Sequence, residues 1–208
     1  MLRGKQRALI RARELAESTE QSLEVWKLER GMRREKLRVV HPAACVATVV
    51  LVGCSKQKRT EEAQAVEMYD PSPLFRKQLA VARQLVRSTR VFIVSAKYGL
   101  VRPWKTLLPY EHTIRDKTKE QRVEWADEVI DLLDAFAGVR FGEEIKETDQ
   151  SLRALNVVLM MGASYARPLR AAAPDDWMFT EPLAGMQIGE RLRWLNSAIR
   201  RAKKGQAT

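Results

Sequence analysis

The sequence predicts an α/β fold: a three-layer sandwich in which helices cover both faces of a mostly parallel four-stranded sheet. Four short apolar runs lack the polar alternation of half-exposed strands, which indicates strands buried on both faces. They cover about residues 46–52, 91–94, 156–161 and 177–180. Helical segments separate these runs, and short right-handed crossovers between strands then favour parallel pairing.

The helical segments have recognisable starts and apolar faces. Ser72 is a good N-cap and Pro73 suits the first helical position, so a helix is expected to begin there. Residues 118–136 carry the clearest amphipathic pattern. A short helix is expected to stop near Pro174, and a last helix covers about residues 190–203.

A basic extension is expected before the α/β domain. The predicted divisions are a helical extension over 1–38, a linker over 39–45, a catalytic-type α/β domain over 46–203 and a tail over 204–208. The extension could dock on the domain through a narrow apolar stripe, or it could follow the phosphates of a nucleic acid. Four cations near its end are the candidates for backbone contacts: Arg33, Arg34, Lys36 and Arg38.

The composition favours a polyanionic partner, most simply DNA or RNA. The chain of 208 residues has 37 Lys and Arg against 26 Asp and Glu, a net charge of +11. No apolar run reaches the ~18 residues of a membrane span, and the amino terminus lacks the apolar core of a signal peptide, so a cytoplasmic protein without a membrane partner is expected. With 2 Cys and 2 His, neither a metal site nor a disulfide is expected, and no cofactor is predicted.

Loops of glycine, serine and aromatic residues follow the first three predicted strands. Carboxyl ends of parallel strands share one edge of the sheet, where ligands bind. We therefore expect one pocket, whose predicted substrate-binding residues are Gly53, Cys54, Ser55, Lys56, Tyr69, Ser95, Tyr98, Gly99, Tyr110, Gly162, Ser164, Tyr165 and Gly185. Lys58 and Arg59, just after the first loop, are expected to contact a nucleic-acid backbone.

The residue types in this pocket suit a nucleobase joined to a sugar phosphate. Lysines beside serines and strand-end amides can bind an anion, and aromatic rings can stack on a flat ring. The phosphate-binding G-x-x-x-x-G-K loop, the dinucleotide-binding G-x-G-x-x-G motif and the G-x-S-x-G elbow of serine hydrolases are absent.

Four residues are the candidates for catalysis. Lys97, in a context that parallels Lys56, could neutralise phosphate or form a Schiff base with a sugar aldehyde. Asp70 or Glu111 could polarise a water or stabilise an oxocarbenium ion, although Asp70 also begins a Pro-Ser-Pro turn and helix cap. His112 could act as general acid or base, against the structural role that is commoner for a lone loop histidine.

Several of these motifs resemble an uncharacterised domain family of bacteria and phages over about residues 46–200. The motifs are Gly53-Cys54-Ser55-Lys56, Met68-Tyr69 with Pro71-Ser72-Pro73, Ser95-Ala96-Lys97-Tyr98-Gly99-Leu100, and Pro182-Leu183 with Gly185-Met186. More distantly, the Cys-Ser-x-Lys loop and the Tyr-x-x-Ser element resemble the glycosylase-like domain of archaeal tRNA-guanine transglycosylase relatives. That domain is similar to the uracil-DNA glycosylase fold, which implies a four-stranded parallel sheet between helices and a protein that handles a base in nucleic acid. The water-activating Gly-x-Asp-Pro-Tyr motif of the glycosylases does not follow the first strand.

The resulting hypothesis is a base N-glycosylase or transglycosylase that acts on a modified base in DNA or RNA, with phage defence as its setting. The base would be flipped into the pocket and stacked on Tyr98 or Tyr110. Two alternatives stay open: a non-catalytic nucleic-acid-binding module, and an enzyme of the deoxyribosyltransferase type that acts on free nucleosides or nucleotides.

Overall fold

The computed structural model describes residues 47–141, 155–175 and 177–205, which belong to one compact unit. The predicted extension 1–38 and linker 39–45 lie outside the described residues, and so do the four cations expected to contact a nucleic-acid backbone: Arg33, Arg34, Lys36 and Arg38.

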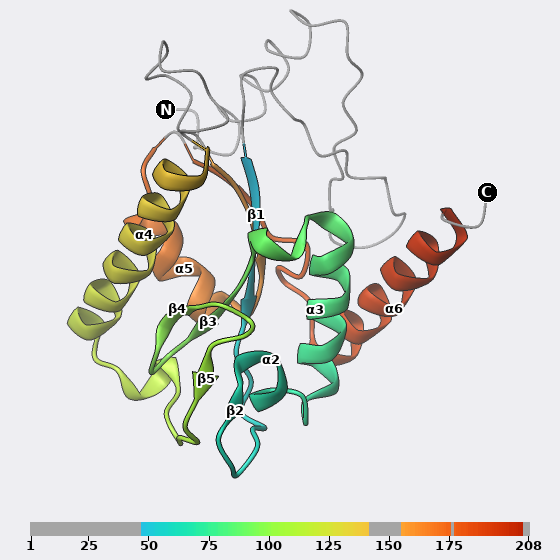
Figure 1. The fold of residues 1–208 in the computed structure, drawn as a ribbon, viewed down its shortest axis with the longest axis horizontal. Helices are drawn as coiled ribbons and strands as arrows, with labels where there is room; N and C mark the ends of the chain where they lie inside the picture. The colour runs from blue at the N-terminus through green and yellow to red at the C-terminus, as the bar shows by residue number, and fades with distance from the viewer. Residues whose placement is uncertain (1–46, 142–154, 176, 206–208) are drawn as a thin grey trace, which may run out of the picture. The chain divides into compact units, whose positions relative to one another are not determined.

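A sheet of five strands forms the middle layer of the described unit (Figure 1). The strands, in the order in which they lie side by side, are β4 (Gly99–Val101), β3 (Val91–Ser95), β1 (Ala47–Gly53), β6 (Leu155–Met160) and β7 (Met178–Thr180). β3, β1, β6 and β7 pair in parallel, and Val50 at the middle of β1 is opposite both Val91 and Val158. The α/β class is therefore confirmed, and all four predicted strands are present.

The fifth strand makes the sheet mixed, a difference from the prediction. The stretch from Ser95 to Leu100 was expected as a loop, but the chain reverses within it and β4 pairs antiparallel with β3. Gly99 permits the reversal, because its φ of 62° lies in the left-handed region that other residues avoid. A separate two-stranded sheet joins β2 (Ala63–Gln64) and β5 (Thr106–Leu107).

Two pairs of helices cover the two faces of the sheet (Figure 1). On one face α3 (Pro73–Leu85) packs with α6 (Ile188–Gly205), and on the other α4 (Lys119–Phe141) packs with α5 (Ala163–Ala172). Successive residues of β1 are buried alternately in the core on one face of the sheet and in the core on the other. The remaining short elements are α2 (Ala65–Met68) and the 3₁₀ turns η1 (Ser88–Arg90) and η2 (Ile114–Asp116).

Local sequence signals explain how these helices begin. The Ser72 hydroxyl accepts a hydrogen bond from the Phe75 amide at 3.3 Å, and Pro73 is the first residue of α3, as predicted. No helix within the described residues is long and apolar enough to span a membrane.

Candidate functional site

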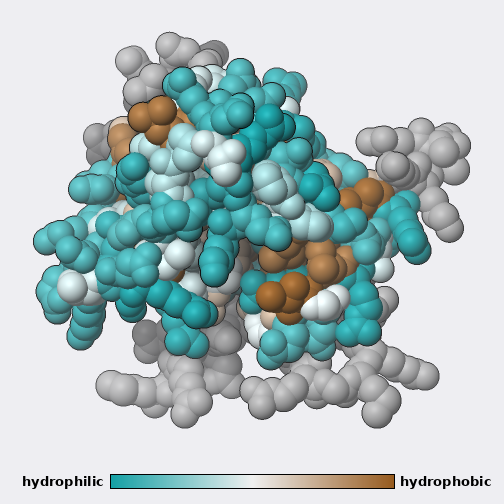
Figure 2. Space-filling view, turned by 90° about the horizontal axis from the view of Figure 1, so that it is seen from below, coloured by the Kyte–Doolittle hydropathy of each residue, from teal (hydrophilic) through white to brown (hydrophobic). Residues whose placement is uncertain are grey.

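The candidate site lies at the carboxyl edge of the parallel strands. The loop after β1 leads toward α3 on one face of the sheet, whereas the loop after β6 enters α5 on the other. In open α/β sheets, the edge where neighbouring strands diverge in this way is the usual ligand site. Figure 2 views the molecule from this end and shows a largely hydrophilic face on which hydrophobic groups form separate patches.

The ends of β1 and β6 approach each other closely at Gly53. A Cβ at this position would lie 2.8 Å from Cβ of Met161, so only glycine fits without a shift. The next residue, Cys54, donates its amide to the Val94 carbonyl at 2.9 Å, which fixes it between two strand ends. Its Sγ lies 3.4 Å from the Tyr165 hydroxyl at the start of α5. Burial, together with Cys54, raises the pKa of Tyr165 far above its ordinary value.

Near this edge of the sheet, three hydroxyl groups form a buried cluster of Tyr69, Ser95 and Tyr110. The Tyr110 hydroxyl lies 2.7 Å from both the Tyr69 hydroxyl and Ser95 Oγ. Ser95 Oγ also accepts the backbone amides of Lys97 and Tyr98, at 3.2 and 3.1 Å. Because these two hydrogen bonds occupy both lone pairs of Ser95 Oγ, the Ser95 hydroxyl acts as the donor in its hydrogen bond with the Tyr110 hydroxyl.

The environment of this hydroxyl cluster keeps the phenols neutral. Burial raises the pKa of Tyr69 to about 12, and burial with the nearby Cys54 raises the pKa of Tyr110 well above its usual range. Tyr69 is fully buried, so its hydroxyl does not contact a ligand in the cavity directly.

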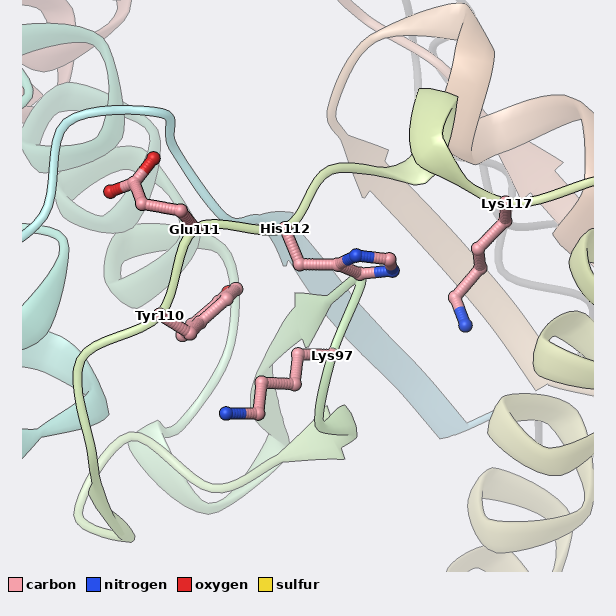
Figure 3. A pocket seen from close by; sticks show the side chains of 5 residues that line it. All are labelled: Lys97, Tyr110, Glu111, His112 and Lys117. Atoms are coloured by element: carbon pink, nitrogen blue, oxygen red, sulfur yellow. The ribbon is translucent and has the colours of Figure 1, made fainter.

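A cavity of about 390 Å³ lies beside this cluster and is lined by Lys97, Tyr110, Glu111, His112 and Lys117. Figure 3 shows the His112 imidazole between Lys97 on one side and Lys117 on the other. The Glu111 carboxylate points away from these three side chains. Three of the five lining residues, Lys97, His112 and Lys117, are therefore basic.

Cations surround the Tyr110 ring. Lys58 Nζ lies 4.5 Å from the ring centroid and Lys97 Nζ lies 5.6 Å from it, both within the range of cation–π attraction. Tyr98 meets the same ring edge-on, and its hydroxyl donates to the Leu108 carbonyl. A base stacked on Tyr110 would have to displace an ammonium group, so the ring is better placed to hold cations than to hold a base.

His112 is paired with a carboxylate on its own loop. Its Nδ1 lies 3.8 Å from Oδ2 of Asp116. The same carboxylate accepts the Thr113 amide at 2.6 Å in a capping box that opens η2. This amide bond is the main reason that the pKa of Asp116 is lowered, so the group stays ionised and can balance a proton on His112.

The predicted site residues separate into three groups. The contacts at the β1 and β6 ends, the hydroxyl cluster and the cavity bring together Gly53, Cys54, Lys58, Tyr69, Ser95, Lys97, Tyr98, Tyr110, Glu111, His112 and Tyr165. The side chains of Lys56, Arg59 and Ser164 are exposed and do not line the cavity, and Ser55 donates to the Gln57 carbonyl in a turn.

The remaining predicted residues occupy turns. Asp70 stands in the turn before α3, where Arg76 donates to its carbonyl, and it does not line the cavity. Gly99 and Gly185 have positive φ values of 62° and 74°. Gly162 is the N-cap of α5.

Comparison with known proteins assigns the sequence to a family. Residues 49–197 match the model of a family of unknown function (DUF6884). The chain belongs to that family. No curated protein and no solved structure matches the chain. The matched region includes β1 from Val49 onward, the hydroxyl cluster, the cavity and the first half of α6.

Sequence reasoning missed two cations of this DUF6884 site, Lys117 and Arg191. Lys117 follows the capping box of Thr113 and Asp116, a pattern that would have predicted a turn beside His112. Arg191 donates to the Met186 carbonyl at 2.9 Å, and its guanidinium lies 3.7 Å from where a Cβ of Gly162 would be. Within the described residues, no group of three His, Cys, Asp or Glu is placed to hold a metal ion.

Proposed function

We propose that the chain is a base N-glycosylase or transglycosylase that acts on a modified base in DNA or RNA. The observation that carries this proposal is the cavity in which His112 lies between Lys97 and Lys117 beside the carboxyl edge of the sheet. Four parallel strands between two pairs of helices also support the resemblance to the uracil-DNA glycosylase fold.

In this proposal His112 is the acid–base residue. When the N-glycosidic bond breaks, its electron pair leaves with the base, and positive charge spreads over C1′ and the ring oxygen of the sugar. His112 gives a proton to the departing base, and water, or an incoming base in the exchange reaction, then adds to C1′. The proton released in that addition returns to the imidazole. Asp116 stabilises the imidazolium through the contact at Nδ1.

The two predicted carboxylates have weaker support than His112. Glu111 lines the cavity but points away from it, so it could stabilise the oxocarbenium ion only after its side chain turns. Asp70 does not line the cavity and takes part in the turn before α3. Lys97 is better placed to hold an anion near the sugar than to attack C1′, because two aromatic rings hold its ammonium group.

Mass spectrometry of bases released from nucleic acid tests the proposal directly. Phage and host DNA and RNA are incubated with the full chain, and phage DNA comes first because of the proposed setting in phage defence. Lys97→Ala and His112→Asn should each remove the activity, whereas Lys105→Ala, an exposed lysine outside the cavity, should retain it. Absence of released base from every substrate, or full activity of both cavity variants, would refute the proposal.

A second candidate is an enzyme that acts on free nucleosides or nucleotides. The volume of about 390 Å³ favours it, because that space suits a small molecule at the low end of ligand sites. Adding free nucleosides and nucleoside 5′-monophosphates to the same experiment distinguishes the two. Release of base from these compounds alone would favour the second candidate.

A further inference from the structure

The basic residues of the cavity lie at two separate ends. Lys97 is at the end formed by Tyr110, and Lys117 is at the opposite end, with His112 between them (Figure 3). Neither ammonium group is paired with a carboxylate of the part of the chain that the structure describes. Two ammonium groups in one cavity repel each other, and an anion bound beside each of them would offset this repulsion. A ligand with two separated anionic groups should therefore bind more strongly than a ligand with one.

Each of these two cations has a defined position. The Lys97 ammonium lies 5.1 Å from the Tyr98 ring centroid and 5.6 Å from that of Tyr110. The backbone amide of Lys97 donates to Ser95 Oγ. Lys58 adds a second ammonium at the Tyr110 ring. A long side chain that is already ordered loses less conformational entropy when it binds an anion.

Lys117 is positioned by the 3₁₀ turn that precedes it. Ile114 in that turn is buried, and the Arg122 guanidinium donates to the carbonyls of Ile114 and Arg115 at 3.0 and 3.3 Å. The capping box closes the same turn. Lys117 is half-buried at its end, so the backbone holds it at the rim of the cavity.

We propose that Lys97 and Lys117 bind the two phosphates on either side of one nucleotide of a nucleic-acid strand. The sugar of that nucleotide then lies next to His112, between the two anions. This inference rests on the proposed function for the identity of the reacting bond, but the two-phosphate site can be measured without any base release. It makes the preferred ligand a strand segment with two phosphates, in contrast to a free nucleoside monophosphate.

Isothermal calorimetry with two small probes tests the two-ended site. Thymidine 3′,5′-bisphosphate should bind more tightly than thymidine 5′-monophosphate, and Lys97→Met or Lys117→Met should each remove that advantage. Lys105→Met should leave it intact. Equal affinity for the two probes in the unaltered protein would overturn the inference, as would an advantage that survives both cavity variants.

The salt dependence of strand binding provides a second, independent measurement. With single-stranded 12-mers, the slope of log K against log salt should become less negative by about 0.7 in each single variant and about 1.4 in the double variant. An unchanged slope in the double variant would refute the two phosphate contacts. DNA and RNA 12-mers of one sequence are compared to identify which strand supplies the phosphates.

The same proteins separate failure of this inference from failure of the proposed function. If the unaltered protein releases no base from any substrate while the His112→Asn protein keeps the bisphosphate advantage, the two-phosphate site stands and the glycosylase proposal fails. If base is released but neither lysine affects the slope, the reverse holds. Thermal melts of Lys97→Met and Lys117→Met check that a lost affinity does not reflect unfolding.

Discussion

The two sides of Tyr110 differ in how completely their polar groups are satisfied. On the buried side the hydroxyls of Tyr69, Ser95 and Tyr110 bond to one another and to two backbone amides. On the cavity side Lys97 and Lys117 have no carboxylate partner among the described residues, and His112 meets Asp116 at 3.8 Å. Buried polar groups need partners to avoid a desolvation penalty, whereas polar groups that line a cavity can bond to solvent until a ligand binds.

This contrast predicts that the two sides contribute to different properties. Changes on the buried side should lower the free energy of unfolding, because they leave hydroxyls or amides without partners. Changes on the cavity side should lower activity or affinity and leave stability nearly unchanged. A variant on the buried side is therefore tested for a loss of stability, and a variant on the cavity side for a loss of activity or affinity.

The largest expected effect is that of His112→Asn on base release. Removing a general acid–base group should slow the reaction by about 100-fold to 10,000-fold. The free energy of unfolding should change by no more than about 0.5 kcal/mol, because among the described residues the polar contact of the imidazole is the 3.8 Å one with Asp116. Rates of base release and urea unfolding curves are measured on the same preparation. A large loss of stability would mean that His112 supports the fold, as the residues on the buried side of Tyr110 do.

The next largest effect is a loss of stability at alkaline pH. The pKa of Tyr69 is about 12 in the folded chain, against an ordinary value of 10.0, so the folded state keeps a proton that the unfolded state releases. Stability should be complete below pH 10 and fall by roughly 3 kcal/mol as the pH rises through about 12. Urea unfolding at steps across this window measures the loss.

Tyr69→Phe is the control for the alkaline effect. The variant is less stable at neutral pH, but its stability should decline less steeply between about pH 10 and 12, because the buried phenol is gone. Equal slopes for the variant and the unaltered protein would mean that Tyr69 does not carry the effect.

Ser95→Ala should destabilise the fold by about 2 kcal/mol. The change leaves the backbone amides of Lys97 and Tyr98 without their acceptor and Tyr110 without its donor. Ser55→Ala is the matched control, since its hydroxyl bonds to a carbonyl in an exposed turn, and it should cost no more than about 0.5 kcal/mol. Similar unfolding curves for the two variants would contradict the contrast between the two sides.

The sequence predicts the strands of the parallel sheet well for a physical reason. Continuous apolar runs such as 46–52 have few stable environments other than a strand between two helical layers. The antiparallel strand β4 escaped prediction because it is three residues long and depends on the reversal at Gly99. Local patterns do not determine such pairing, since its hydrogen bonds come from a strand formed elsewhere.

The site was predicted less completely than the fold. Tyr69, Ser95 and Tyr110 were expected in one pocket, but no sequence signal separates a tyrosine that lines a cavity from one buried behind it. Lys56 and Lys97 looked equivalent, yet only Lys97 faces the cavity, because the loop after β1 turns away at Ser55. Spacing predicts which strand end a residue follows, and the turn then decides where its side chain points.

The smallest expected effect concerns the strand end next to Cys54. Gly53→Ala should destabilise the chain by about 1 to 2 kcal/mol, because the new methyl would lie 2.8 Å from Cβ of Met161 and both strand ends must shift. Gly189→Ala is the matched control: its methyl would meet no described heavy atom within 4 Å, and alanine suits a helix better, so it should stabilise α6 by about 0.5 to 1 kcal/mol. Opposite signs in urea unfolding would show that the close approach of the β1 and β6 ends, and not the loss of glycine as such, sets the cost. Because the shift also moves Cys54 and the loop after β1, binding at the cavity beside Tyr110 should weaken only in Gly53→Ala.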